Sequence, residues 1–304
     1  MKVAIIGGGA IGMLVAAYLN KANIKPVIYT RRKEQAQALN EKGLEFIKNG
    51  ITTTYKVKAV PFSEGLLNDE DIILITVKQY DLDPILDYLN RRKIKSSVLF
   101  LQNGMSHTVH LSNLQSESIY LGIVEHGVLK QSDRSILHTG EGRIKIAKYR
   151  GNFGVVVSLS NAFNSIGFPI IMEGNWYETL ANKLVVNAVI NPLTALYGVR
   201  NGSLLENHFY FINMRSVFLE VVQALALTEV DSLWDEVISI CRKTGSNYSS
   251  MYKDIENGRQ TEINSILGYL LEEGEKRMVP IPMLKFLYNS IKGMETEGKE
   301  EGNG

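Results

Sequence analysis

The sequence predicts an α/β protein with two domains, an N-terminal domain built on a parallel sheet and an all-helical C-terminal domain. The chain has 304 residues, a length typical of about two domains. Its first half alternates short apolar, β-branched runs with helical patterns, which is typical of strands that alternate with helices. From Trp176 onward the strand pattern disappears and the apolar spacing becomes helical. We therefore predict a boundary near Glu173-Gly174, with domains at residues 1–173 and 174–304.

The composition is that of an ordinary globular protein. Hydrophobic residues make up 45% of the chain, and the formal net charge is +1. A balanced charge gives no reason to expect nucleic acid or an anionic membrane as a partner. No apolar run approaches the roughly 18 residues of a membrane span. The run of glycines at 7–9 also argues against a signal-peptide helix at the N-terminus.

The chain offers few residues for metal binding. Its only cysteine, Cys241, excludes an intramolecular disulfide and any cysteine-cluster metal site. A single cysteine fits the reducing cytoplasm, where we expect the protein. The histidines share no metal-ligand spacing, so we expect structural or surface roles and no metal for all of them: His107, His110, His126, His138 and His208.

A glycine motif lies directly after the first predicted strand, Lys2–Ile6. Gly7, Gly9 and Gly12 match the pattern G-x-G-x-x-G, and a predicted helix follows. Gly7 permits a tight turn, Gly9 lets the backbone approach a pyrophosphate, and Gly12 allows the helix to pack closely. The N-terminus of that helix would offer N–H groups and the positive end of a dipole to phosphates. The motif therefore predicts a Rossmann-type dinucleotide-binding domain, with a glycine-rich turn that binds nothing as the alternative. The cofactor-binding residues expected here are Gly7, Gly9, Ala10, Ile11 and Gly12.

The end of the second predicted strand, Pro26–Tyr29, indicates which dinucleotide binds. Rossmann domains that prefer NAD carry an acidic residue about 20 residues past the glycines. Here Arg31 and Arg32 occupy that region, and no acid comes before Glu34. An arginine fork matches a 2′-phosphate in geometry and charge. Arg31 therefore predicts NADP(H), unless both arginines are ordinary solvated surface.

Two further strand ends carry polar residues. The apolar run Asp71–Val77 is typical of a parallel strand covered on both faces, and Lys78 follows it. The predicted strand Ser97–Leu101 ends in a Gln-Asn-Gly sequence that contains Asn103. Ligands of open parallel sheets lie beyond the carboxyl ends of the strands. We therefore expect Lys78 to reach the cofactor and Asn103 to lie at its nicotinamide end; a surface lysine and a plain turn are the alternatives.

The remaining patterns predict further regular elements. Strands or hairpins are expected at 45–60, 119–124, 143–147 and 168–172. Helices are expected at 34–42, 83–90, 155–163, 176–191, 207–226, 232–244, 261–278 and 282–294. We also expect a turn at 138–142, and a charged, glycine-rich tail at 295–304 that frays.

One predicted helix of the second half carries the strongest signal for a binding site. Lys183, Asn187 and Asn191 recur every four residues among apolar residues, so they share one face. Burying polar groups without partners costs roughly 1–3 kcal/mol each. Three of them in a row indicate either a substrate site or a buried polar network between helices. Pro192 should break or kink this helix just past Asn191, and an Asn-Gly turn is expected at 201–202.

Two polar pieces complete the set of candidate residues, a Ser-Ser pair at 249–250 and a Thr-Glu pair at 261–262. Thr261 is a plausible N-cap, which would put Glu262 in the first helical turn. There the helix dipole favours a carboxylate even without a ligand. Ser250 by itself has the pattern of a capping or loop residue.

In this order, the motifs resemble those of the ketopantoate reductase (2-dehydropantoate 2-reductase) family from Met1 to about Pro282. The residues that carry the resemblance are Gly7, Gly9, Gly12, Arg31, Lys78, Asn103-Gly104, Lys183, Asn187, Asn191-Pro192, Asn201-Gly202, Ser249-Ser250-Met251 and Thr261-Glu262-Ile263. The Lys-Asn-Asn-Pro series and the two late pieces are the most specific, because many dehydrogenases share the glycine motif. The resemblance implies a Rossmann domain joined to an all-helical domain like that of 6-phosphogluconate dehydrogenase, with the active site between them.

The resemblance also implies an activity, the reduction of 2-dehydropantoate to (R)-pantoate by NADPH on the route to pantothenate and coenzyme A. A lysine with an ordinary pKa of about 10.4 is protonated at neutral pH. Lys183 can therefore stabilise the developing alkoxide and donate a proton, and the resemblance makes it the general acid. Glu262, the second expected catalytic residue, would accept a hydrogen bond from the terminal hydroxyl of the substrate and help select a hydroxylated keto acid. The residues expected to hold the substrate are Asn103, Lys183, Asn187, Asn191, Asn201, Ser250 and Glu262.

Two other functions stay open at this point. A related NADP-dependent reductase that acts on another 2-keto acid would not need Glu262. A non-catalytic protein that senses NADP(H) would use the Lys183 face as scaffolding, since a fold alone does not define a function. A homodimer is also possible, because Phe209, Tyr210 and Phe211 either form a dimer face or pack inward.

Overall fold

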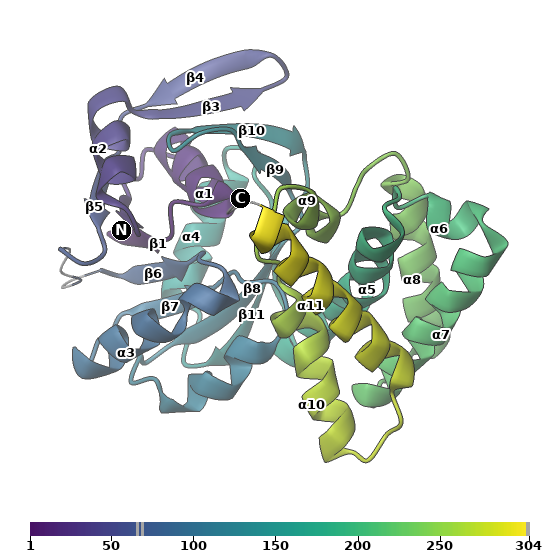
Figure 1. The fold of residues 1–304 in the computed structure, drawn as a ribbon. Helices are drawn as coiled ribbons and strands as arrows, with labels where there is room; N and C mark the ends of the chain where they lie inside the picture. Colours follow the sequence, from purple (N-terminus) through teal and green to yellow (C-terminus); the bar gives the residue numbers. More distant parts are fainter. Residues whose placement is uncertain (65–66, 68–69, 302–304) are drawn as a thin grey trace. The chain divides into compact units, whose positions relative to one another are not determined.

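In the computed structural model, the described residues 1–64, 67 and 70–301 form two compact units (Figure 1). The first unit contains Met1–Gln102 and Val109–Thr179. The second contains Leu180–Gly304 together with the short segment Asn103–Thr108. The predicted strand-rich first half and helical second half are both present.

The first unit is built on an eight-stranded sheet with the order β12-β11-β8-β7-β6-β1-β2-β5. Neighbouring strands are parallel throughout, except that β11 runs antiparallel to β8. Both β1 and β6 are buried along their whole length, as expected for parallel strands covered on both faces. The sheet confirms the predicted Rossmann-like N-terminal fold. Its strands are β1 (Val3–Ile6), β2 (Val27–Thr30), β5 (Lys58–Pro61), β6 (Ile72–Ile75), β7 (Ser97–Phe100), β8 (Ile119–Val124), β11 (Ile144–Arg150) and β12 (Ile170–Glu173).

A second sheet of four strands lies in the same unit, with the order β4-β3-β10-β9. Its strands are β3 (Leu44–Lys48), β4 (Ile51–Tyr55), β9 (Gly127–Lys130) and β10 (Ser135–Gly140). The predicted turn at 138–142 is therefore wrong at its start, because His138 belongs to β10 and pairs with both β3 and β9. The physical cause is the burial of a polar residue. His138 points inward and is only 5% exposed, whereas an alternating strand pattern predicts an apolar residue at such a position.

Helices cover both sheets of the first unit. Helix α1 packs against β1 of the large sheet and against β3, β9 and β10 of the small one, while α2 packs on β2 and β5. The helices of this unit are α1 (Ala10–Lys21), α2 (Lys33–Lys42), the 3-10 turn η1 (Gln79–Asp81), α3 (Asp83–Arg91) and α4 (Gly154–Asn164). A further 3-10 segment, η2 (Ser106–Asn113), runs from the short segment of the second unit into the first.

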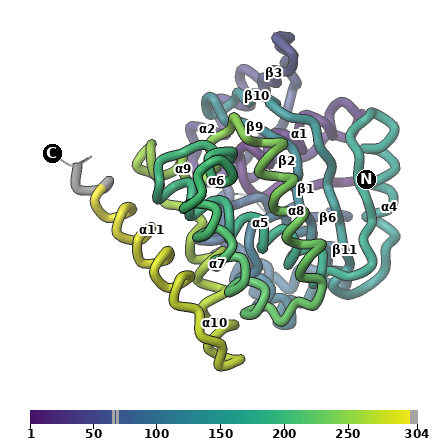
Figure 2. The backbone as a smooth tube through the Cα atoms, turned by 90° about the vertical axis from the view of Figure 1, so that its right-hand side faces the viewer, coloured from purple at the N-terminus to yellow at the C-terminus, as the bar shows by residue number. Residues whose placement is uncertain are grey.

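The second unit is helical throughout its described residues, apart from the loops that join its helices. Helix α7 packs against α6, α10 and α11, and α11 also packs along α10 (Figure 2). The helices are α5 (Trp176–Tyr197), which begins at the end of the first unit, α6 (Ser203–Glu206), α7 (His208–Ala224), α8 (Val230–Lys243), α9 (Ser250–Glu256), the π-helix η3 (Asn264–Gly268), α10 (Tyr269–Lys276) and α11 (Pro282–Glu301).

Two predictions about these helices are wrong. The predicted break after Asn191 is wrong, because helix α5 continues through Pro192 to Tyr197. Pro192 removes only its own N–H from the ladder, and the next turn is buried and held by the Thr194 hydroxyl, which donates to the carbonyl of Ile190 at 2.8 Å. The predicted Asn-Gly turn at 201–202 is confirmed.

The predicted frayed tail is also wrong as far as the described residues reach, because α11 continues to Glu301; residues 302–304 lie outside them. Glu295 is only 7% exposed and accepts hydrogen bonds from the backbone N–H and the hydroxyl of Thr261, at 2.8 and 2.6 Å. A buried tertiary contact thus holds the first residue of a segment whose composition is typical of a solvated end.

The histidines and the cysteine are divided between buried and exposed positions. His107, His126 and His138 are buried, whereas His110 and His208 are exposed. Cys241 is a buried free thiol, and burial raises its pKa to about 12. In the described part of the chain, no helix has the length and apolar character needed to cross a membrane.

Candidate functional site

The glycine turn between β1 and α1 has the geometry of a phosphate cradle. Gly7 adopts a φ of +121°, which side chains rarely tolerate, and a Cβ on Gly12 would collide with the carbonyl oxygen of Gly7. A Cβ on Gly9 would meet nothing within 4 Å. Helix α1 begins without a side-chain cap, so its first N–H groups are available to an anion. A dinucleotide diphosphate fits this arrangement, with Ala10 and Ile11 in the first helical turn.

Two residues that support this turn were missed by the sequence analysis. The hydroxyl of Thr76, which follows β6, donates to the carbonyls of Ile6 and Gly7 at 3.1 and 3.0 Å. The side-chain amide of Gln35 donates to the carbonyl of Gly8 at 2.6 Å. A threonine after a strand and a glutamine on a helix carry no distinctive signal in one sequence, so only the fold could reveal them.

The predicted cationic groups lie beyond the ends of β2 and β6, as expected. The Arg31 side chain is 76% exposed, and its Nη1 lies 3.0 Å from the Asp81 carboxylate. Arg32 also forms an ion pair, with Asp133, but its side chain is less exposed, at 49%. Lys78 immediately precedes η1, and its ammonium lies 5.9 Å from the centre of the Tyr80 ring. Arg31 is therefore the arginine that can turn to a cofactor phosphate, at the cost of a weak surface ion pair.

The Lys183 face lies on α5, which is helical through all three of its candidate residues, so they lie in one row. Asn187 is 9% exposed, and Lys183 and Asn191 are half-buried. The helix around them is apolar and buried at most positions. A partly desolvated ammonium beside carboxamides can bind an anionic or carbonyl oxygen more strongly than the same groups in water.

Asn103 and Glu262 form the most informative contact in the second unit. The Asn103 amide Nδ2 donates to Glu262 Oε2 at 3.0 Å. Gly104 makes this possible: its φ is +79°, and a Cβ there would collide with the carbonyl of Ser265 in η3. The N–H of Met105 donates to the same carbonyl at 3.3 Å. The strand-end segment is thus held against the π-helix, a type of turn often found at functional sites.

We expected Glu262 to lie within the first helical turn. Instead, it lies directly before that turn. Its carbonyl accepts from the N–H groups of Ser265 and Ile266 at 3.1 Å. The neighbouring Thr261 accepts from the N–H of Ile263 and is itself held by Glu295. Burial alone would raise the pKa of Glu295, but hydrogen bonds from Lys292 and Thr261 outweigh it, so this pKa lies below its usual value. A charged anchor therefore fixes the backbone beside Glu262.

The two remaining candidate residues lie in different surroundings. The amide Nδ2 of Asn201 donates to Thr244 at 2.9 Å, and its buried Oδ1 has no partner among the described residues. Ser250 is exposed and begins α9. Its neighbour Ser249 caps α9, and its hydroxyl is hydrogen-bonded to the hydroxyl of Thr194 at 2.8 Å. That bond connects the start of α9 to α5, whereas the orphaned Oδ1 leaves Asn201 able to accept from a ligand.

Within the described residues, no group of three or more histidine, cysteine, aspartate or glutamate side chains could hold a metal ion. The candidate residues themselves supply two ammonium groups, a guanidinium, carboxamides, hydroxyls and the carboxylate of Glu262.

The parallel sheet, its glycine turn and the helical second unit define a Rossmann-like α/β protein with a helical domain. Two family models match this chain: Ketopantoate reductase PanE/ApbA over residues 3–151 and Ketopantoate reductase PanE/ApbA C terminal over residues 175–295. The chain belongs to the ketopantoate reductase family.

Individual relatives are similar to this chain over almost its whole length. The chain is 40% identical to the 2-dehydropantoate 2-reductase of Bacillus subtilis over 296 residues, covering 97% of this chain and 98% of that protein. It is 38% identical to the protein of the same name from Listeria innocua over 300 residues, covering 98% of each. The crystal structure of PanE from Bacillus subtilis has a TM-score of 0.88 at 40% identity, covering 97% of this chain and all of that one.

The same fold also carries another activity. A ternary structure of D-mandelate dehydrogenase with NADH and anilino(oxo)acetate has a TM-score of 0.89 at 24% identity, covering 98% of this chain and all of that one. At that identity the likeness extends to the fold alone, so the substrate must be argued from side chains.

Proposed function

We propose that this protein reduces 2-dehydropantoate to pantoate with NADPH as the hydride donor. The observation that carries the proposal is the row of Lys183, Asn187 and Asn191 on a continuous α5, in a chain of the ketopantoate reductase family. The full-length similarity to 2-dehydropantoate 2-reductases supports the same substrate.

The cofactor half of the site is assigned to the first unit. Gly7, Gly9 and Gly12 with the start of α1 hold the diphosphate, Arg31 holds the 2′-phosphate, and Lys78 binds the ribose or the same phosphate. When bound, the nicotinamide supplies the hydride. Arg31 favours NADPH over NADH because its guanidinium matches a dianionic phosphate in charge and shape.

The reacting ketone is assigned to Lys183. Its ammonium donates a hydrogen bond to the ketone oxygen and then the proton, as negative charge develops on that oxygen. Asn187, Asn191 and Asn201 offer neutral hydrogen bonds to the carboxylate and the ketone, and exposed Ser250 offers a hydroxyl. Because these side chains are neutral, they would hold the substrate without forming an ion pair with the Lys183 ammonium.

Selection of the substrate is assigned to Glu262, oriented by Asn103. One carboxylate oxygen accepts from the Asn103 amide, and a carboxylate has further lone pairs with which to accept from the terminal hydroxyl of 2-dehydropantoate. A keto acid without that hydroxyl would not form this hydrogen bond and would bind less well.

The experiment that tests the function follows NADPH absorbance with purified protein and four acids: 2-dehydropantoate, 2-oxoisovalerate, pyruvate and 2-oxoglutarate. Rapid oxidation with 2-dehydropantoate alone is expected. Oxidation of NADPH with a different acid would indicate a reductase that acts on another 2-keto acid. Tight NADPH binding without any turnover would instead support a protein that senses the cofactor.

We also propose a homodimer formed through the second unit. Phe209 and Phe211 are exposed, by 73% and 36%, while Tyr210 packs inward on Tyr197 with ring centres 4.2 Å apart. A ketopantoate reductase from Staphylococcus aureus is described as dimeric. Light scattering of the purified protein and of Phe209→Ser tests the proposal, which fails if the unchanged protein is monomeric at micromolar concentration.

A further inference from the structure

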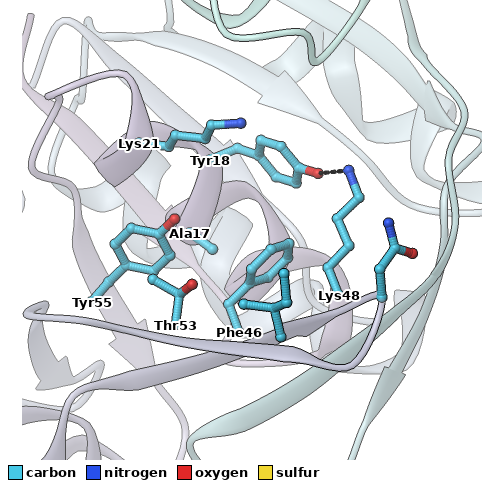
Figure 3. Close-up of a pocket in the computed structure, with 9 residues that line it drawn as sticks. Ala17, Tyr18, Lys21, Phe46, Lys48, Thr53 and Tyr55 are labelled. Carbon is cyan, nitrogen blue, oxygen red and sulfur yellow. Dashed lines mark hydrogen bonds between the residues drawn. The ribbon is translucent and has the colours of Figure 1, made fainter.

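A cavity of about 300 Å³ lies in the first unit, away from the glycine turn (Figure 3). It is bounded by the last turns of α1 and by one face of the β3–β4 hairpin. The residues that line it are Ala17, Tyr18, Lys21, Phe46, Lys48, Asn49, Ile51, Thr53 and Tyr55. Helix α1 has 12 residues and so spans about 18 Å, which separates this cavity from the phosphate cradle at the other end of the helix.

The hairpin places alternate side chains on the cavity. Asn49 and Gly50 both have positive φ, 50° and 75°, as in the tight turn that an Asn-Gly pair favours. Phe46 then pairs directly with Thr53, and Lys48 with Ile51. Because strand side chains alternate between faces, these residues all point to one side of the sheet. The face is continuous and belongs to two paired strands, so its shape is held by backbone hydrogen bonds.

Aromatic side chains form the apolar part of the cavity. The rings of Tyr18 and Phe46 meet edge to face, with centres 5.5 Å apart, and those of Phe46 and Tyr55 lie 6.4 Å apart. At the rim, the side chain of Ile51 is 69% exposed, next to the aromatic rings. A flat apolar group would cover it and contact the rings.

Two ammonium groups flank the same ring. Lys21 Nζ lies 5.8 Å and Lys48 Nζ 5.9 Å from the centre of the Tyr18 ring. Lys48 also donates to the Tyr18 hydroxyl at 3.3 Å and forms an ion pair with Glu141, whose side chain is 72% exposed. Lys21 donates to the carbonyl of Ile166 at 3.3 Å. Two cations against one exposed carboxylate leave a net positive charge at the cavity.

The floor of the cavity is held from beneath by a buried chain of hydrogen bonds. The N–H of Gly142 donates to His126 Nδ1, so the nearby His138 Nε2 must be the donor of the pair, at 3.1 Å. His138 Nδ1 is then the acceptor for the Tyr18 hydroxyl at 3.1 Å. Burial lowers the pKa of both histidines, so the floor is neutral and the charge of the cavity comes from its lysines. Tyr18 is thereby fixed in one orientation.

We propose that this cavity binds a small aromatic carboxylate, as a second ligand site distinct from the cofactor and substrate residues. The carboxylate pairs with Lys21 and Lys48, and the flat ring lies against Tyr18, Phe46 and Tyr55. A monoanion matches the net charge left after Glu141 is counted.

The test uses 1-naphthoate as the probe and isothermal titration calorimetry as the measurement, with 1-naphthamide as the neutral analogue. One site for 1-naphthoate is expected, with much weaker binding of the amide. Lys21→Gln and Lys48→Gln should each weaken 1-naphthoate by about threefold to tenfold, as for a charge-assisted hydrogen bond at a partly exposed site. Lys58→Gln, an exposed lysine of β5, is the matched control and should change nothing.

Further variants distinguish binding at this cavity from binding at the proposed substrate residues and from a disturbed hairpin. Lys183→Ala must leave the affinity for 1-naphthoate unchanged, because a loss would mean that the probe binds the proposed substrate residues instead. Lys21→Gln keeps the Lys48–Tyr18 bond, so it reports on charge even if Lys48→Gln disturbs the hairpin. Thr53→Trp should abolish binding by filling the cavity. The proposal is overturned if the acid and the amide bind equally, if neither lysine variant matters, or if 1-naphthoate does not bind at millimolar concentration.

Discussion

The amide of Asn103 donates a 3.0 Å hydrogen bond to the carboxylate of Glu262, a residue 159 positions later in the chain. The bond gives a strand-end asparagine and a helix-start glutamate a shared geometry. It occupies one oxygen of Glu262 and fixes the direction in which the other lone pairs point. We regard it as the orienting contact of the proposed substrate site.

Replacing Glu262 by glutamine should therefore impair selection of the substrate. A hydrogen bond to a charged group contributes about 1.5–3 kcal/mol, so kcat/KM for 2-dehydropantoate should fall by about tenfold to a hundredfold. The value for 2-oxoisovalerate, which lacks the hydroxyl, should change little. Steady-state kinetics with both acids measure the ratio, and Glu256→Gln on the exposed face of α9 is the control. Equal losses for both acids would contradict the role of Glu262.

Lys183→Ala should lower kcat by about 10²- to 10⁴-fold, the usual range for a lost general acid. NADPH affinity should be unchanged, because the residues proposed for the cofactor lie in the first unit. Stopped-flow turnover and fluorescence titration of NADPH separate the two effects, with the exposed Lys243→Ala as control. Near-normal turnover in the Lys183 variant would remove it as the acid.

Arg31→Ala should weaken NADPH by about tenfold to a hundredfold, as expected for a lost charge-assisted contact to a phosphate. NADH, which has no 2′-phosphate, should bind as before. Arg32→Ala is the matched control, because it removes the neighbouring arginine, which is also in an ion pair but whose side chain is less exposed, 49% against 76%. Titrating both dinucleotides into each variant gives the comparison, and a similar loss for NADPH and NADH would mean that Arg31 does not read the phosphate.

Gly9→Ala and Gly12→Ala should impair different properties, NADPH binding in the first variant and stability in the second. A Cβ at Gly9 stands in open space, so this variant should unfold at the normal temperature but bind NADPH poorly, since the methyl group occupies the approach of the diphosphate. A Cβ at Gly12 collides with the backbone of Gly7, so this variant should be less stable by about 2 kcal/mol or more. Thermal unfolding with NADPH titration tests both, and a destabilised Gly9 variant would count against the cradle.

Stability should decrease as the pH falls from neutral toward 4, in part because of His126. Burial, together with the neighbouring His138, lowers the pKa of His126 to about 4, while the unfolded chain has the ordinary value of about 6.5. The unfolded state therefore binds more protons between these values, and the stability present above pH 6.5 is lost progressively below it. The free energy of unfolding should fall by at most about 2 kcal/mol from this group between pH 7 and pH 5.

Urea unfolding at several pH values measures this dependence. His126→Asn cannot titrate and should show a shallower decline, while the exposed His110→Asn should behave like the unchanged protein. Identical slopes in all three proteins would mean that His126 does not contribute.

Local features of the chain were predictable because their physical causes are local. Three glycines after an apolar strand specify a tight turn and an open helix start whatever surrounds them, and β1, α1 and the turn are where the pattern predicts. The four-residue spacing of Lys183, Asn187 and Asn191 likewise requires only that α5 be a helix. Membership of the family and the Rossmann-like fold followed from such motifs.

The tertiary structure decided what depends on partners that are distant in sequence. His138 lies in a strand because Tyr18 and His126 accommodate an inward imidazole, and Pro192 stays within a helix because its surroundings are buried. Glu295 is ordered by Thr261, and the Asn103–Glu262 bond exists because Gly104 meets the carbonyl of Ser265. By itself the sequence determined the elements and the residue types of the site; only packing decided which of them meet, since a hydrogen bond between distant residues leaves no periodic trace in the chain.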